Sequence, residues 1–198
     1  MFDLNDKGFN GTVIFNNGQG GKVEGVSISV EKKDAEQPDT YPAYKLIVED
    51  ATGGKINQGF YYPTPKQGDS EENNMKRIKR EVGRVIHIAR AVVGNEPLPT
   101  VSNAKEAYDV LFKLINDKAV GQTFNVFATY GTAGYASKYL GLRYFDFIEN
   151  TSLPTGRLSV KNGDLLDRVV EDDSASDDMS MDATSSTPTG SSIENWNA

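Results

Sequence analysis

Residues 44–62 read Tyr44-Lys-Leu-Ile-Val-Glu-Asp50, Ala51-Thr-Gly-Gly54 and Lys55-Ile-Asn-Gln-Gly-Phe-Tyr-Tyr62. The first and third parts are rich in the β-branched and aromatic residues that strands favour. The middle part holds two adjacent glycines, which adopt the positive φ angles of tight turns without steric cost. This stretch therefore predicts a β-hairpin with strands over residues 44–50 and 55–62.

Another strand is expected upstream, over residues 23–31. Its residues alternate between an apolar and a polar face: Val26, Ile28 and Val30 against Ser27, Ser29 and Glu31. A period of two is typical of a half-buried strand. Residues 34–42 contain two prolines and are expected to form a loop. Residues 11–15 are a candidate for a short extra strand.

Downstream of the hairpin, the spacing of apolar residues changes to that of a helix. Between residues 69 and 93 these residues fall within one arc of a helical wheel: Met75, Ile78, Val82, Val85, Ile86, Ala89 and Val93. Asp69 with Glu72 looks like a capping pair, and Gly94 suits the position after the last turn. A second helix is expected over residues 102–119, with its apolar side formed by Ala107, Tyr108, Leu111, Leu114 and Ile115.

Two further strands are expected after the helices, over residues 122–130 and 143–149. Their residues alternate in type, so Phe124 and Phe147 are expected in the core. The loop between these strands would span residues 131–141. A final short helix is a candidate over residues 164–170.

The expected order of elements is three strands, two helices and two strands. We therefore predict a mainly β, α+β fold like the OB-fold, a five-stranded, partly open barrel. The helical insert lies between strands three and four, and at two helices it is larger than usual. Another small α+β sheet with the same order is the alternative. We expect one domain over residues 1–170 and a tail over residues 171–198.

The tail differs sharply from the body in charge. The chain has 21 Lys and Arg and 28 Asp and Glu residues, which gives a net charge of −7. The tail holds no Lys or Arg and seven of the acids: Glu171, Asp172, Asp173, Asp177, Asp178, Asp182 and Glu194. The net negative charge therefore lies in the tail, and the body is balanced. We expect a disordered acidic tail beside a body that can still bind an anion.

The residues that metal and nucleophile chemistry require are scarce. The chain has no Cys, which excludes disulfides and thiolate ligands, and His87 is its only histidine. His87 falls on the polar side of its helix, so we expect it at the surface. The glycine-rich residues 17–22 lack the Gly and the Ser or Thr that a phosphate-binding loop needs. We expect no metal, no cofactor and no catalysis.

No apolar run approaches the ~20 residues that span a bilayer, and the first residues lack the features of a signal peptide. We therefore expect a soluble cytoplasmic protein that contacts no membrane.

Aromatic and basic residues are interleaved in residues 41–45, 60–66 and 130–145. Single-stranded nucleic acid needs this mixture, because bases stack on flat rings and cations contact phosphates. In an OB-fold the binding face is built from strands two and three and from the loops joining strands one–two and four–five, where all three clusters fall. The expected binding residues are Tyr41, Tyr44, Lys45, Tyr61, Lys66, Tyr135, Lys138, Tyr139 and Arg143. The alternative is that these aromatics only reflect the usual composition of strands.

The helix over residues 69–93 carries a second group of cations: Lys76, Arg77, Lys79, Arg80, Arg84 and Arg90. They form a solvated helix face, a stripe that contacts phosphates or a dock for the acidic tail. The sequence leaves these three readings open.

With five strands, aromatic–basic clusters and an acidic tail, the chain resembles the single-stranded-DNA-binding proteins of bacteriophages. The segment from Tyr130 to Ile148 shares in this resemblance. The resemblance implies a non-catalytic protein of phage DNA replication, recombination and repair, located in the host cytoplasm. It also implies a tail that recruits replication or recombination proteins and competes with DNA.

The tail residues that would recruit partners are Asp177, Asp178, Asp182, Ile193 and Trp196. Such tails commonly end in acids plus a terminal aromatic or apolar residue, whereas here Trp196 is followed by two residues and only Glu194 is near. The alternative is a phage virion protein or a protein-interaction module that uses the tail and Trp196 as a docking peptide. The oligomeric state and the choice between DNA and RNA stay open.

Overall fold

The computed structural model describes residues 14–34, 40–130, 138–141 and 146–158. These residues form a short 3-10 turn, six strands and two α-helices. In chain order they are Phe15–Gly18 (the 3-10 turn), β1 Gly21–Lys32, β2 Tyr44–Glu49, β3 Lys55–Phe60, α1 Glu71–Val93, α2 Ala104–Lys118, β4 Phe124–Tyr130, β5 Lys138–Leu140 and β6 Ile148–Asn150. The α+β class and the two helices between the third and fourth strands are as predicted.

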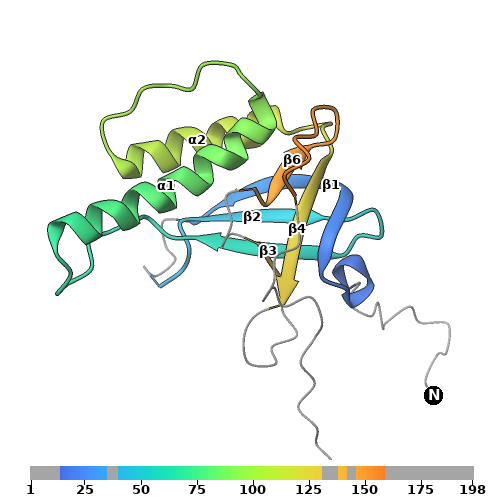
Figure 1. The fold of residues 1–198 in the computed structure, drawn as a ribbon, viewed down its shortest axis with the longest axis horizontal. Coiled ribbons are helices and arrows are strands. Elements are labelled where there is room, and N and C mark those ends of the chain that lie inside the picture. The colour runs from blue at the N-terminus through green and yellow to red at the C-terminus, as the bar shows by residue number, and fades with distance from the viewer. Residues whose placement is uncertain (1–13, 35–39, 131–137, 142–145, 159–198) are drawn as a thin grey trace, which may run out of the picture.

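The strands form one antiparallel sheet that β1 holds together. The order is β3-β2-β1-β4-β5, with β6 beside β4. One part of β1 pairs with β2, and its beginning pairs with β4. The register with β4 shifts between Val23 and Val26, where Gly25 has a φ of 70°. A bulge of this kind bends a strand, and β1 is strongly curved (Figure 1).

The two ends of this strand path approach each other. Cα atoms of β3 and β5 come within 8 Å, but no ladder joins the two strands in the described part of the chain. The sheet is therefore open between them.

The predicted hairpin is formed by β2 and β3, and Asp50 organises its turn. The Asp50 carboxylate accepts hydrogen bonds from the backbone N–H groups of Thr52 (2.8 Å) and Gly54 (2.9 Å) and from the Thr52 hydroxyl (2.6 Å). It also accepts from the N–H of Asn16 at 2.6 Å, which fastens the 3-10 turn to the hairpin. Residues 14–18 are thus not strand, and residues 11–13 lie outside the described residues.

Both helices lie on one side of the sheet (Figure 1). α1 packs against α2 and β6, and α2 packs against β1. The buried side chains of α2 are Ala107, Tyr108, Leu111, Phe112 and Ile115. The apolar side predicted for this helix included Leu114 and left out Phe112. In the structure, Phe112 is fully buried.

The ends of α1 are close to those predicted, but its cap is not Asp69. Ser70 precedes the first helical residue, and its hydroxyl accepts a hydrogen bond from the N–H of Asn73 at 3.2 Å. Gly94 ends the helix with a φ of 62°, as expected of a residue that tolerates positive φ.

The buried face of α1 is shifted from the predicted arc. The buried residues are Val85, Ile88, Ala89 and Val92, all in the second half of the helix. Met75 and Ile86, which the arc included, are 48% and 38% exposed. The first turns of α1 extend past the sheet (Figure 1), so the core covers only part of the apolar stripe.

The last predicted strand, over residues 143–149, is wrong in its bounds. The chain instead forms β5 inside the predicted loop and β6 at the end of the predicted strand. Phe127 in β4 joins both, because its N–H donates to the Phe147 carbonyl at 2.8 Å and its carbonyl accepts from Gly141 at 2.7 Å. A three-residue strand shows too little alternation to be recognised from sequence.

The core lies between the sheet and the helices. Phe124 and Phe147 are fully buried, as predicted. β4 is covered on both faces, because its alternating neighbours Asn125 and Phe127 are buried as well. The helix expected over residues 164–170 and the tail over residues 171–198 lie outside the described residues. Within the described ranges, neither helix combines the length and apolarity needed to cross a membrane.

Candidate nucleic-acid interface

A pocket of about 560 Å³ lies where β1 ends and the chain leaves β3. The residues that line it are Lys32, Lys33, Asp34, Tyr41, Ala43, Tyr61, Tyr62 and Thr64. They come from the end of β1, the β1–β2 loop and the segment after β3. The N–H of Lys33 donates to the Ala43 carbonyl at 3.0 Å and so closes the base of the loop. We call this site the tyrosine pocket.

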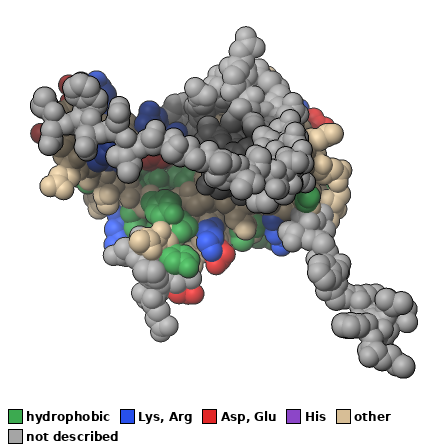
Figure 2. Space-filling view, turned by 90° about the horizontal axis from the view of Figure 1, so that it is seen from below, with side chains coloured by type: hydrophobic (Ala, Val, Ile, Leu, Met, Phe, Trp, Pro, Cys, Tyr) green, Lys and Arg blue, Asp and Glu red, His purple; other side chains and the backbone are tan. Residues whose placement is uncertain are grey.

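Two tyrosine rings of this pocket are open to solvent. Tyr41 is 47% and Tyr61 is 57% exposed. A Cβ on Gly59 would lie 3.1 Å from Pro42 and 3.9 Å from the Tyr61 ring, so the glycine makes room for both. The face seen from below gathers hydrophobic side chains beside charged ones (Figure 2). Both rings thus have the exposure that base stacking requires, and this role stays a prediction.

The expected stacking role of Tyr44 is contradicted. Tyr44 is only 4% exposed and stacks on Phe112 with ring centroids 4.5 Å apart. Burial and the bond to Asp109 raise the pKa of Tyr44. In β2, every second residue faces the core, and Tyr44 shares this face with Leu46 and Val48, which are fully buried. This period of two is the sequence signal from which a buried Tyr44 could have been predicted.

Asp109 of α2 forms a cluster beside the pocket that the sequence analysis missed. Its Oδ1 accepts hydrogen bonds from the hydroxyls of Tyr44 and Tyr62, the latter at 2.7 Å. The Lys32 ammonium lies 3.6 Å from the same oxygen. Burial by itself raises the pKa of Asp109, but the two hydroxyls and Lys32 outweigh burial and hold the pKa below its usual range. The carboxylate is therefore ionised at neutral pH.

Of the predicted cations in described segments, Lys45 is paired on the sheet. It lies opposite Glu31 in the β1–β2 register, with N and O atoms 3.6 Å apart. Glu49 and Lys55 form a similar pair at 3.1 Å on the β2–β3 ladder. These four charges cancel, so they give the outer face of the β1–β3 sheet no net positive charge.

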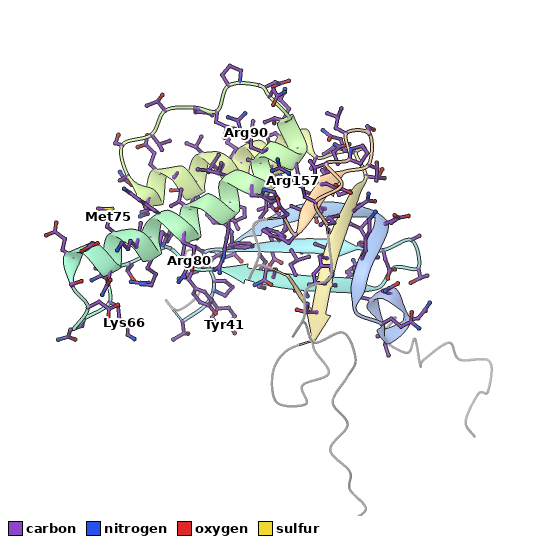
Figure 3. All side chains as sticks on the ribbon, viewed as in Figure 1. Tyr41, Lys66, Met75, Arg80, Arg90 and Arg157 are labelled. Carbon is purple, nitrogen blue, oxygen red and sulfur yellow. The ribbon has the colours of Figure 1, made fainter. Side chains whose placement is uncertain are left out.

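Lys66 is exposed, and its backbone is fixed by α1. Asn74 accepts from the Lys66 N–H at 2.7 Å and donates to the Lys66 carbonyl at 3.2 Å. Lys66 and Tyr41 lie on the same side of the molecule, below the first half of α1 (Figure 3). Lys66 thus lies on the same side of the molecule as Tyr41, which lines the tyrosine pocket.

Most cations of α1 have protein partners, which favours a structural reading for them. Lys76 pairs with Glu72 at 2.6 Å, and Arg84 pairs with Glu81 at 2.8 Å. Two arginines donate hydrogen bonds instead. Arg77 donates to the Thr64 carbonyl and to the Asn74 side chain. Arg90 donates to the carbonyls of Gly94 and Glu96. Lys79 and Arg80 are exposed. Among the described residues, neither Lys79 nor Arg80 forms a hydrogen bond or an ion pair through its side chain.

His87 is not the surface residue that the sequence predicted. Its Nε2 lies 3.2 Å from the Ile148 carbonyl, and its ring centroid lies 5.4 Å from that of Phe147. Burial is the main effect on His87 and lowers its pKa. The prediction failed because α1 is covered by β6 on that side, which no local pattern shows.

The remaining predicted residues belong to β5 or lie outside the described residues. Lys138 and Tyr139 belong to β5, where their backbones pair with Tyr130 and Thr129. Tyr135 and Arg143 lie outside the described residues. So do the tail residues Asp177, Asp178, Asp182, Ile193 and Trp196. The structure thus gathers Tyr41 and Tyr61 at one pocket, with Lys32 and Lys33, which the sequence analysis did not select.

No family model, curated protein or solved structure matches this chain.

The residues of the pocket themselves indicate its chemistry. Exposed rings offer stacking surfaces, and lysine ammonium groups offer contacts for anions. Among the described residues, no group of three or more His, Asp or Glu side chains is arranged to hold a metal ion.

Proposed function

We propose that this protein binds single-stranded nucleic acid, in the first place DNA, and does so without catalysis. The observation that supports this proposal is the tyrosine pocket. It combines two exposed rings, Tyr41 and Tyr61, with Lys32 and Lys33 in a space of about 560 Å³. Flat apolar surface next to positive charge is the combination that single strands need, since every base has a π face and every linkage a phosphate.

The topology supports the same proposal. The path β3-β2-β1-β4-β5, with its ends near each other, is the order of a five-stranded OB barrel that is open between two strands. We propose that this fold is such a barrel. Its ligands bind over strands two and three and the loop between strands one and two. The tyrosine pocket lies at this place, because the β1–β2 loop and the exit from β3 form it.

The wider role follows the resemblance drawn from the sequence. We place the protein in phage DNA replication, recombination and repair in the host cytoplasm. The acidic residues 171–198 would recruit partner proteins and compete with the nucleic acid for the pocket. Support for the tail comes from its charge alone, since it holds seven acids and no Lys or Arg.

The test is a fluorescence anisotropy titration of labelled oligo-dT, with oligo-rU as a second probe. Base stacking on a ring is worth about 1–3 kcal/mol, so Tyr41→Ala or Tyr61→Ala should weaken binding by about five- to 150-fold. Tyr41→Phe keeps the ring and should bind like the wild type. Leu153→Ala removes an apolar side chain that is 67% exposed and lies between α1 and the end of β6. It should change nothing.

The salt dependence of the affinity is a second test of the proposal. Binding should weaken as salt rises, because phosphate contacts release counterions. Equal affinities of Tyr41→Ala, Tyr61→Ala and Leu153→Ala would contradict the proposed site. Absence of binding to both probes at low salt would contradict the function. The ratio between the dT and rU affinities decides the preferred nucleic acid.

A further inference from the structure

Lys32 lines two neighbouring pockets. It lines the tyrosine pocket, and it also lines a groove of about 440 Å³ between β1 and α2. Its side chain is 65% exposed, and its ammonium lies 3.6 Å from Asp109 Oδ1. Charge-assisted hydrogen bonds between N and O atoms are shorter, about 2.7–2.9 Å. The ammonium is therefore near the carboxylate without being locked to it.

Asp109 does not depend on Lys32 for hydrogen bonds. The hydroxyls of Tyr44 and Tyr62 both donate to its Oδ1. The Tyr44 ring is fixed by burial and by stacking on Phe112. If the Lys32 ammonium moves away, the Asp109 carboxylate keeps its hydrogen bonds from both hydroxyls, so Oδ1 is not left without a partner.

Resting on the proposed function, we propose that Asp109 competes with the bound strand for Lys32. When a single strand enters the tyrosine pocket, one of its phosphates takes over the Lys32 ammonium from the Asp109 carboxylate. The long flexible stem of a lysine allows this change of partner. Asp109 thereby weakens the binding of nucleic acid, and the tyrosine hydroxyls hold it in place to do so.

The central variant is Asp109→Asn, which removes the charge and keeps an oxygen that can accept from both hydroxyls. An exposed ion pair changes an equilibrium by a factor of up to about five. Asp109→Asn should therefore tighten binding of oligo-dT about two- to fivefold. The slope of log affinity against log salt should stay close to that of the wild type, because the number of phosphate contacts is unchanged. Lys32→Gln should weaken binding and reduce this slope by about 0.7, the value for one contact to a single strand.

Asp117→Asn is the matched control. Asp117 lies on the same helix and also pairs with a lysine, Lys113, at 2.6 Å. Its replacement changes the net charge by the same amount without touching the tyrosine pocket. It should tighten binding by clearly less than Asp109→Asn. In the double variant Lys32→Gln with Asp109→Asn, the second change should have little further effect.

A measurement on the wild-type protein covers the case in which Asp109→Asn does not fold. The pKa of the Asp109 carboxyl, followed by NMR, should rise when oligo-dT is added, because Lys32 leaves and a phosphate approaches. An unchanged or lower pKa overturns the inference. So does equal tightening by Asp117→Asn, or a full effect of Asp109→Asn in the Lys32→Gln background. If Tyr41→Ala weakens binding but Asp109→Asn does not tighten it, this inference fails while the proposed function stands; if neither probe binds at all, both fail.

Discussion

Replacement of Glu149 by Gln should destabilise the fold by about 2–4 kcal/mol at pH 7. Glu149 is only 2% exposed. Its Oε2 accepts from the Thr155 N–H (2.7 Å), the Thr155 hydroxyl (2.9 Å) and the Gly156 N–H (3.1 Å), and its Oε1 accepts from Asn125 Nδ2 at 3.2 Å. The carboxylate thus ties β6 to β4 and to the following loop.

The magnitude follows from these contacts. The Gln oxygen must take the place of Oε2 to serve its three donors, so the amide NH₂ then faces the Asn125 NH₂. Two donors opposite each other leave a buried group unsatisfied, which costs about 1–3 kcal/mol. Loss of the charge weakens the three remaining bonds, and this adds about 1 kcal/mol.

The loss should also depend on pH. Burial by itself raises the pKa of Glu149, but the hydrogen bonds from Asn125, Thr155 and Gly156 outweigh burial and hold the pKa below its usual value. A depressed folded pKa contributes stability above the unfolded pKa, and this contribution is lost as pH falls through the folded pKa. The difference between wild type and Glu149→Gln should therefore shrink below about pH 4.5, the ordinary glutamate range.

Urea unfolding followed by circular dichroism measures this difference at pH 7 and at pH 3.5. Glu31→Gln is the control, since Glu31 is 54% exposed and pairs only across strands; it should cost less than about 1 kcal/mol. A loss below about 0.5 kcal/mol for Glu149→Gln, or a loss that is equal at both pH values, would show that the buried carboxylate does not stabilise the fold through these hydrogen bonds.

Three further predictions concern the turn, the cap and the tail. Gly54→Ala should lower stability by about 1–3 kcal/mol in thermal unfolding, because its Cβ would lie 2.6 Å from the Phe15 backbone; an unchanged melting temperature would contradict this close approach. Ser70→Ala should cost about 1 kcal/mol and Asp69→Ala clearly less, since Ser70 is the cap of α1; the reverse order would restore the cap predicted from sequence. Truncation after Val170 should tighten oligo-dT binding, because it removes seven acids, and weaker binding would argue against competition by the tail.

Local patterns were sufficient where neighbours in sequence decide the structure. The hairpin over residues 44–62, both helices and the buried positions of Phe124 and Phe147 follow from periods of two and 3.6 and from turn residues. The exposed rings Tyr41 and Tyr61 were also selected correctly as surface residues. Their partners at the pocket, Lys32 and Lys33, carried no local signal.

The patterns failed where packing between distant segments decides. Tyr44 was assigned to the surface with Tyr41, although α2 covers it through Phe112. His87 was placed in solvent, although the carbonyl of Ile148 in β6 faces its ring. The last predicted strand is replaced by β5 and β6. The backbone of Phe127 in β4 hydrogen-bonds to Gly141, after β5, and to Phe147, before β6.

Spacing and composition were enough to predict the α+β class, the hairpin followed by two helices, and the separation of charge between body and tail. These properties depend on spacing and composition, which are local. Packing between distant segments brings Asp109 to Lys32 and two tyrosines, buries Glu149 among hydrogen-bond donors, and gives four of the six α1 cations their partners. These contacts depend on how helices and strands pack against each other, and the period of a single segment does not encode that packing.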